Sequence, residues 1–155
     1  MGHKVHPYGY RLGYTRTWTA KWYADKEYTA LLQEDIAIRQ LLDKRLANAS
    51  VSGVEIARGV NHVTVAIHTA KPGIVIGRKD IGELSKRKVK LEIKEIRQPE
   101  LDAYLVALNI AQQLTRRVAY KKAMKQSIQR SMKAGAKGVK IALAGRLGGS
   151  EMGRR

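Results

Sequence analysis

Residues 71–80 read Lys-Pro-Gly-Ile-Val-Ile-Gly-Arg-Lys-Asp, an apolar run that enters a glycine and is followed at once by two cations. Glycine lets the backbone approach a ligand closely, because it has no side chain to collide with it. Arg78 and Lys79 then present positive charge where a phosphate group would lie. The stretch therefore predicts a loop that grips a nucleic-acid backbone through Gly77, Arg78 and Lys79. For the glycine alone, an ordinary turn is the open alternative.

The segments around this loop alternate between helical and strand patterns. The expected elements are a helix over 27–49, strands over 51–58 and 62–70 joined as a hairpin, a helical turn at 72, a short helix over 81–87 and a strand over 88–97. The first helix is expected to have one apolar face, made of Leu31, Leu32, Ile36, Leu42 and Leu46. Three strands with a helix on one face predict a small α+β domain.

Helix, hairpin, glycine loop, helix and strand follow one another in the order of the type II KH fold. The loop resembles the Gly-x-x-Gly loop of KH domains, which clamps backbone nucleotides. The second glycine of that loop is Asp80 here. An acidic side chain beside a phosphate is unfavourable, so the clamp is either altered or used differently.

Two further helices and one strand are expected after this domain. Pro99 and the acids that follow it predict a helix start, with a buried side made of Leu101, Leu105, Leu108, Ile110 and Leu114. The pair Arg116-Arg117 predicts a change of helix, and the second helix runs to about Lys133. Gly135 is suited to a helix C-terminus. Alternation over 137–144 predicts a strand, for which residues 150–155 show no partner.

The second helix carries two neighbouring stripes on a helical wheel. The apolar stripe consists of Tyr120, Met124, Ile128 and Met132, and the other of Lys122, Lys125, Gln129 and Lys133, with Lys121 at its edge. A solvated face usually mixes signs, whereas no acid occurs here between Arg116 and Glu151. Phosphate contact is therefore favoured over simple solvation for Lys121, Lys122, Lys125 and Lys133, and the flanking Arg116, Arg117 and Arg146 join this candidate set.

The charge of the whole chain points to a polyanionic partner. Its 155 residues include 30 basic and 13 acidic ones, a net charge of +17. Residues 116–155 hold 12 of the basic residues and one acid. Such a chain repels itself unless nucleic acid or an anionic membrane neutralises it. No apolar run approaches the roughly 18 residues of a transmembrane helix, so we expect no membrane partner.

The first 28 residues hold seven of the nine aromatic residues, interleaved with cations that include Lys4, Arg11 and Arg16. Three glycines, a proline and no sustained periodicity predict an extended arm. Its rings can stack on bases while the cations pair with phosphates. The alternative is that the rings pin the arm to the domain. His3 and His6 lack further ligands nearby, so no metal is expected.

Three domains follow from these patterns: an aromatic and basic arm (1–28), a KH-like RNA-binding domain (29–98) and an incomplete C-terminal domain (99–155). With no cysteine, the chain has no disulfides, thiolate zinc sites or cysteine nucleophiles. Its acids occur at spacings typical of ion pairs, and His68 lies on a polar alternation without a partner. We therefore expect no cofactor and no enzymatic activity; an enzyme acting on nucleic acid, such as a lyase or nuclease, is the third hypothesis.

Seven blocks of the chain resemble the universal uS3 family, the bacterial-type small-subunit ribosomal protein S3. The blocks are Met1-Gly-His-Lys-Val-His-Pro with Gly9-Tyr-Arg-Leu-Gly, Ala49-Ser-Val-Ser, His68-Thr-Ala-Lys-Pro-Gly-Ile-Val-Ile-Gly, Arg97-Gln-Pro-Glu-Leu-Asp-Ala, Gln113-Leu-Thr-Arg-Arg, Lys121-Lys-Ala-Met-Lys, and Gly135-Ala-Lys-Gly with Gly145-Arg-Leu-Gly-Gly. They occur in the order of the family and cover residues 1 to about 151. Two departures are a segment after the loop that is about ten residues shorter and a C-terminal domain that continues further in the family.

The resemblance implies a protein of the head of the small subunit, bound to ribosomal RNA at the channel where mRNA enters. It implies that Lys121, Lys122 and Lys125 face mRNA. The family often has arginine at the positions of Lys121 and Lys122. It also implies neighbours of the S10 and S14 types and a cytoplasmic ribosome, with an organellar ribosome as an open alternative. A free KH-type RNA-binding regulator or RNA chaperone remains the second hypothesis.

Overall fold

The computed structural model describes residues 2–76, 88–150 and 152–154. The chain divides into two compact units, residues 1–95 and residues 96–155, which are described separately here. In unit 1 the elements are α1 (Pro7–Tyr10), β1 (Ala20–Lys21), α2 (Tyr28–Arg45), β2 (Val51–Arg58), β3 (His62–Thr69), α3 (Pro72–Ile76) and β4 (Lys88–Glu95). In unit 2 they are η2 (Pro99–Leu101), α4 (Ala103–Thr115), α5 (Tyr120–Lys133), β5 (Ala144–Gly145) and β6 (Gly153–Arg154).

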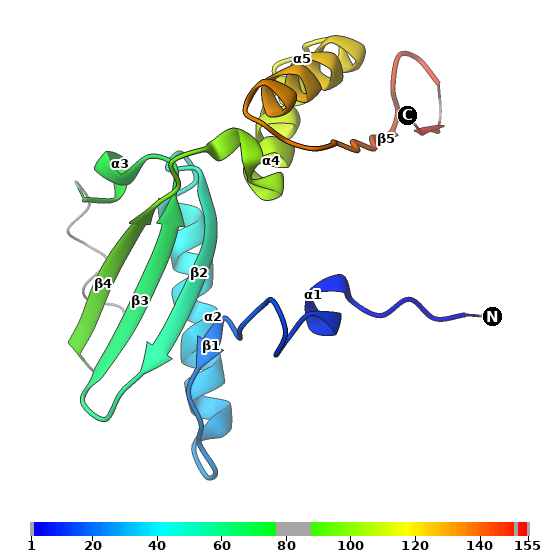
Figure 1. Ribbon diagram of the computed structural model, residues 1–155. Coiled ribbons are helices and arrows are strands. Elements are labelled where there is room, and N and C mark those ends of the chain that lie inside the picture. Colours follow the sequence, from blue (N-terminus) through cyan, green and yellow to red (C-terminus); the bar gives the residue numbers. More distant parts are fainter. Residues whose placement is uncertain (1, 77–87, 151, 155) are drawn as a thin grey trace. The chain divides into compact units, whose positions relative to one another are not determined.

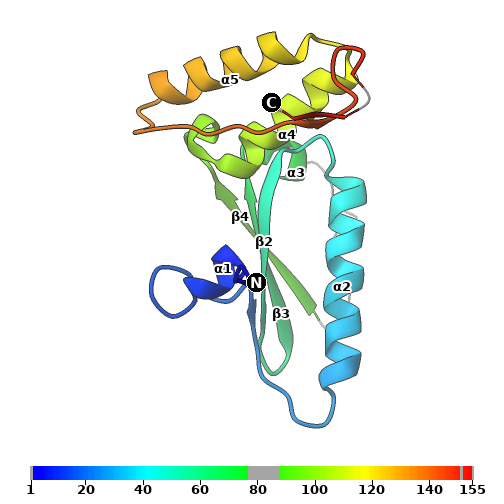
Figure 2. The same cartoon turned by 90° about the vertical axis from the view of Figure 1, so that its right-hand side faces the viewer.

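Unit 1 is a four-stranded sheet in the order β1-β2-β3-β4, with α2 packed along one face (Figures 1 and 2). The predicted hairpin is confirmed, because β2 and β3 pair antiparallel, whereas β4 lies parallel to β3 with Val65 opposite Leu91. The α+β fold of a type II KH domain is therefore confirmed. The short helix expected over 81–87 lies outside the described residues.

The core of unit 1 forms between α2 and the alternate residues of the strands that face it. Its buried members are Ile38, Leu42, Leu46, Ala49, Ile56, Val63, Val65, Ile67 and Val75. Two residues of the expected apolar face are not in this core: Leu32 is 39% exposed and Ile36 is 46% exposed. The charged Asp35 is buried in their place, at 4% exposure, because it has a cationic partner on the sheet.

The N-terminal arm is more structured than the sequence predicts. A short helix, α1, and a closed loop precede β1, which pairs parallel with β2 at the edge of the sheet (Figure 1). The loop is closed by a bridge between Leu12 and Arg16 and by the backbone bond from Gly13 N–H to the Arg16 carbonyl, 3.0 Å long. The arm is thus a folded appendage that joins the sheet as its first strand.

Unit 2 packs α4 and α5 against each other and against η2. The first of these helices begins at Ala103 and not at Pro99, because the Asp102 carboxylate accepts hydrogen bonds from the N–H groups of Tyr104 and Leu105 at 2.9 and 3.1 Å. A carboxylate in this position caps the free N–H groups of a helix start. Leu101 consequently lies in η2 and is exposed, contrary to the expectation that it is buried.

The predicted apolar stripe of α5 lies beside the most buried side of the helix: Tyr120, Met124 and Ile128 are half-buried. The buried residues are Ala123, Ser127 and Ser131, spaced by four, whereas Met132 is 48% exposed. Small side chains on that face let the helix backbone approach its neighbours closely, and the larger residues beside them are displaced to the margin of the contact. The predicted helix change at Arg116-Arg117 and the helix end before Gly135 (φ +97°) are confirmed.

The strand expected over 137–144 is largely wrong. Only Ala144–Gly145 forms a ladder, and its antiparallel partner is Gly153–Arg154, in the tail where no partner was expected. Residues 138–143 are extended without forming a described ladder. Their inward alternation is nevertheless correct, because Val139, Ile141 and Leu143 are partly buried along the α4 side of unit 2.

Candidate nucleic-acid interface

The predicted phosphate clamp at Gly77, Arg78, Lys79 and Asp80 lies outside the described residues. The structure does describe the segment that leads into it. Thr69 is fully buried, its hydroxyl donates to the Ala49 carbonyl at 2.6 Å, and it accepts from the Lys71 N–H at 3.0 Å. Of the apolar run that follows, only Val75 is buried. The Val75 side chain and the Thr69 hydroxyl therefore both help to anchor the approach to the predicted clamp.

The cations of α5 all lie away from its packed side. Lys121, Lys122, Lys125 and Lys133 are exposed, whereas the small residues of the opposite stripe are buried. Residues three and four apart are neighbours on a helix surface, so Lys122 and Lys125 present their ammonium groups on the same side. The structure brings these predicted residues together on one helix.

The other predicted residues of unit 2 lie on its connections. Arg116 and Arg117 form the turn between α4 and α5, where Arg117 adopts a left-handed conformation with φ +61°. Arg146 follows β5 and is exposed. The sequence reasoning did not select Arg130, Lys137 and Lys140, which are exposed cations of the same unit. The absence of acids between residues 116 and 150 is the signal that could have included them.

Several cations of unit 1 have an anionic partner, among them Lys21, Arg58, Lys90 and Lys94. In the described part of the chain from 116 to 154, no lysine or arginine side chain forms an ion pair. On the open face of the sheet, by contrast, Glu55 accepts from Lys21 at 3.1 Å and lies within 3.8 Å of Lys94. The hydrogen bond from Lys21 is the main reason why the pKa of Glu55 is lowered. Glu55 therefore offsets part of the positive charge on the sheet face, whereas no described acid does so on the α5 face.

His68 has a partner that the sequence did not reveal. Its Nε2 lies 3.3 Å from Oε1 of Glu55, across the β2–β3 pair. The ring belongs to the same surface cluster as Lys21 and Lys94. This contact supplies a structural reason for the polar side chain at position 68.

Two cations of the arm, Arg11 and Arg16, are held by contacts within the arm. Arg11 Nη1 donates to the Pro7 carbonyl at 2.9 Å, and the Arg16 guanidinium lies 5.9 Å from the centre of the Tyr8 ring. Lys4 is exposed. Arg11 and Arg16 therefore have defined positions while still presenting donors to solvent.

A buried network attaches the arm to the domain. The indole N–H of Trp22 donates to Asp35 Oδ2 at 2.8 Å, and the guanidinium of Arg58 bonds Asp35 and Glu34. The Trp22 ring also lies 5.8 Å from the Arg58 guanidinium and 5.4 Å from the Tyr28 ring. The predicted alternative, in which rings pin the arm, thus holds for these aromatic residues.

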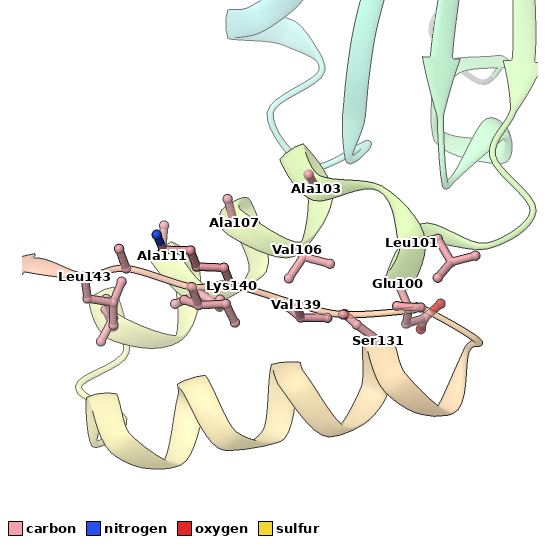
Figure 3. A pocket seen from close by; sticks show the side chains of 16 residues that line it. Glu100, Leu101, Ala103, Val106, Ala107, Ala111, Ser131, Val139, Lys140 and Leu143 are labelled. Atoms are coloured by element: carbon pink, nitrogen blue, oxygen red, sulfur yellow. The ribbon is translucent and has the colours of Figure 1, made fainter. Parts of the chain in front are cut away.

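A groove of about 430 Å³ in unit 2 is lined mainly by aliphatic side chains. Val106 and Ala107 of α4 lie along one side, and Val139 and Leu143 of the extended segment lie along the other (Figure 3). Glu100 and Lys140 are its ionisable members. The groove is a seam between packed elements and lacks the converging polar groups of a catalytic pocket.

The described residues include no group of three histidine, aspartate or glutamate side chains that could hold a metal ion. None of the helices that the structure describes has both the length and the apolar character needed to span a bilayer. The described surface does offer exposed ammonium and guanidinium groups, which can bind phosphates.

Known proteins resemble this chain over nearly its whole length. A family profile described as a KH domain matches residues 37–79, and one described as the C-terminal domain of ribosomal protein S3 matches residues 110–155. Proteins named small ribosomal subunit protein uS3 from Streptococcus pyogenes serotype M5, Streptococcus equi subsp. equi and Streptococcus agalactiae serotype III are each 53% identical to it. Each alignment covers 99% of this chain and 75% of the relative.

Proposed function

The chain belongs to the uS3 family of small ribosomal subunit proteins, and we propose that it binds small-subunit ribosomal RNA and contacts mRNA through the cations of α5. It is a structural protein of the ribosome and not an enzyme. The finer proposal is that Lys121, Lys122 and Lys125 lie at the channel where mRNA enters the subunit. The observation that carries this proposal is the exposed side of α5, which has several cations and no paired acid.

An electrostatic role follows from the kind of cation present. Lysine offers a mobile point charge, whereas arginine offers a planar fork that binds a phosphate through two parallel hydrogen bonds. Lys121, Lys122 and Lys125 would therefore hold a passing RNA strand by charge, without fixing its orientation closely. Weakly oriented contacts suit a strand that must move through the channel.

The remaining candidate residues are proposed to bind ribosomal RNA. In unit 2 these are Arg116, Arg117, Lys133 and Arg146, in the arm Lys4, Arg11 and Arg16, and in the loop Gly77, Arg78 and Lys79. Neighbouring proteins of the S10 and S14 types are proposed as protein partners, and the cytoplasm as the location of the ribosome. The similarity to uS3 proteins extends through the arm and unit 2, which a free KH-type regulator would not need.

The proposal is tested by measuring how RNA affinity depends on salt. Each phosphate contact contributes about 0.7 to 0.9 to the slope of log affinity against log salt. The triple variant Lys121→Ala, Lys122→Ala, Lys125→Ala should therefore lower that slope by roughly 2 to 2.7 if all three residues bind phosphates. The measurement is fluorescence anisotropy of a labelled structured RNA between about 50 and 300 mM potassium chloride.

The matched control removes the same charge from the other unit. The variant Lys26→Ala, Lys44→Ala, Lys90→Ala changes three exposed lysines of unit 1, one of which already pairs with Glu92. Its slope should fall less than that of the α5 variant. If both variants lower the slope equally, net charge explains the binding, and the specific role of α5 is wrong.

A further inference from the structure

The aromatic residues of the N-terminal arm form two groups in the structure. Tyr8, Trp22 and Tyr28 are anchored: the Tyr8 hydroxyl donates to the Thr17 carbonyl at 2.8 Å, and the other two belong to the network around Asp35. Tyr10, Tyr14, Trp18 and Tyr23 are 73%, 91%, 67% and 85% exposed, and the Tyr23 hydroxyl donates to the neighbouring Asp25. Only the first group pins the arm, so the second group needs another explanation.

The exposed rings are carried on an ordered support. The N–H groups of Thr15 and Arg16 both donate to the Arg11 carbonyl at 3.1 Å, and the Leu12–Arg16 bridge closes the loop. Tyr14 lies within this loop, and Trp18 follows the Tyr8-bound Thr17 directly. Because the supporting backbone is held at both sides, little conformational entropy is lost when a ligand contacts these rings.

The chemistry of the arm favours an RNA ligand over a protein surface. Residues 1–24 contain Lys4, Arg11, Arg16 and Lys21 and no acidic residue. Lys21 pairs with Glu55, which leaves Lys4, Arg11 and Arg16 beside the exposed rings. Aromatic rings beside such cations match a nucleic-acid strand, because the rings stack on bases while the cations bind phosphates. Bases within a duplex are already stacked on one another, so only unpaired nucleotides can offer a free face.

We propose that Tyr14 and Trp18 form a stacking platform for unpaired bases of ribosomal RNA. This inference rests on the proposed function and names the kind of RNA that the arm recognises. Arg11 and Arg16, whose positions are fixed by contacts to Pro7 and Tyr8, hold the adjoining phosphates. The platform thus selects single-stranded segments without reading their sequence, because every base has a face that can stack.

The test uses the full chain and two RNA probes of equal nucleotide number, an unstructured 12-nucleotide strand and a 12-nucleotide hairpin in which every base is paired because a linker without bases replaces the loop. Tyr14→Ala and Trp18→Ala should each weaken binding of the unstructured strand roughly fivefold or more, and binding of the hairpin less than twofold. Tyr14→Phe and Trp18→Phe should stay within about twofold of the parent, because phenylalanine keeps a ring that stacks. Tyr104→Ala, which changes a 59% exposed tyrosine of unit 2, is the control.

The outcomes separate stacking from charge. A stacking contact changes affinity by the same factor at every salt concentration, so the salt slope of the alanine variants should equal that of the parent. Unchanged affinity for the strand, or an equal loss for strand and hairpin, overturns the platform. A platform that fails while the α5 triple variant still lowers the salt slope leaves the proposed function standing and makes the exposed rings candidates for a protein contact.

Discussion

Removing the guanidinium of Arg58 should cost more stability than removing any exposed ion pair of unit 1. The side chain of Arg58 is 3% exposed and that of Asp35 is 5% exposed. Arg58 Nε bonds Asp35 at 3.0 Å, and the other guanidinium nitrogens bond Glu34 at 2.5 Å and the Leu31 carbonyl at 3.2 Å. The variant Arg58→Met keeps an apolar chain of similar length and removes all of these donors.

The expected magnitude comes from the charge that is left behind. Breaking a buried ion pair by removing one partner costs about 3–5 kcal/mol, because the other charge stays buried without compensation. Asp35 would keep only the Trp22 indole N–H among the donors of this network, which is too little for a carboxylate at 4% exposure. A domain of this size has a total stability of about 5–15 kcal/mol, so the loss would be a large part of it.

Urea unfolding followed by Trp22 fluorescence measures this loss directly. The background variant Trp18→Phe leaves Trp22 as the only tryptophan, and Trp22 belongs to the network itself. For a slope near 2 kcal/mol/M, the midpoint of Arg58→Met should fall by roughly 1.5–2.5 M. Lys21→Met, which breaks the exposed pair with Glu55, should cost only about 0.2–1 kcal/mol.

A second variant separates the buried charge from simple loss of packing. Replacing Asp35 by Leu together with Arg58→Met removes both charges, and apolar replacement of a buried pair is often neutral or better. The double variant should therefore be more stable than Arg58→Met alone. A double variant that loses the sum of the two single losses, or an Arg58→Met variant within 1 kcal/mol of the parent, would refute the reasoning.

Two further predictions concern packing and pH. Ala123→Leu should destabilise unit 2 by about 1–3 kcal/mol in thermal unfolding, because Ala123 is fully buried on the packed side of α5. Met132→Ala, on the exposed side, should change the stability by no more than about 0.5 kcal/mol. Equal effects of the two variants would contradict the burial of the Ala123 side. The pKa of Glu55 is lowered from 4.5, and the hydrogen bond from Lys21 is the largest cause. The ionised Glu55 therefore stabilises the fold above pH 4.5, and this stabilisation is lost as the pH falls through the lowered pKa of the folded state. The stability difference between the parent and Glu55→Gln should accordingly shrink below pH 4.5 in urea titrations, and a difference that does not change with pH would contradict the ion pairs of the sheet face.

Local patterns predicted the kind and order of the elements well. Alternation located β2, β3 and β4, because successive side chains of a strand point to opposite faces and one face of this sheet is covered by α2. Gly135 located the end of α5, since its φ of +97° suits a residue without a side chain. These features depend on neighbours in sequence, and local reasoning therefore finds them.

The sequence predicted burial less well at positions where burial depends on a contact with a residue far away in the chain. Asp35 is buried because Arg58, 23 positions away, pairs with it, and the apolar Ile36 is left at the surface. Periodicity alone treats the carboxylate as a surface group. The same limit applies to α5, where the packing of other segments of unit 2 selects Ala123, Ser127 and Ser131 over the larger apolar residues.

The residues of the candidate site also divide into those that the sequence identified and those that only the structure identified. Charge counting along the sequence found Lys121, Lys122 and Lys125, because a helix without acids must expose its cations. Only the structure separated the aromatic residues of the arm into those that bind the domain and those that remain exposed, since the contacts of Trp22 reach Asp35 and Arg58.

The sequence by itself therefore determined the fold class, the family and the basic character of the surface, because periodicity, glycine positions and charge are local properties of the chain. The tertiary structure decided which residues are buried, where the C-terminal ladder forms and which aromatic rings of the arm stay exposed. These outcomes depend on pairs of residues brought together by folding: Arg58 with Asp35, Tyr8 with Arg16 and Ala144 with Arg154.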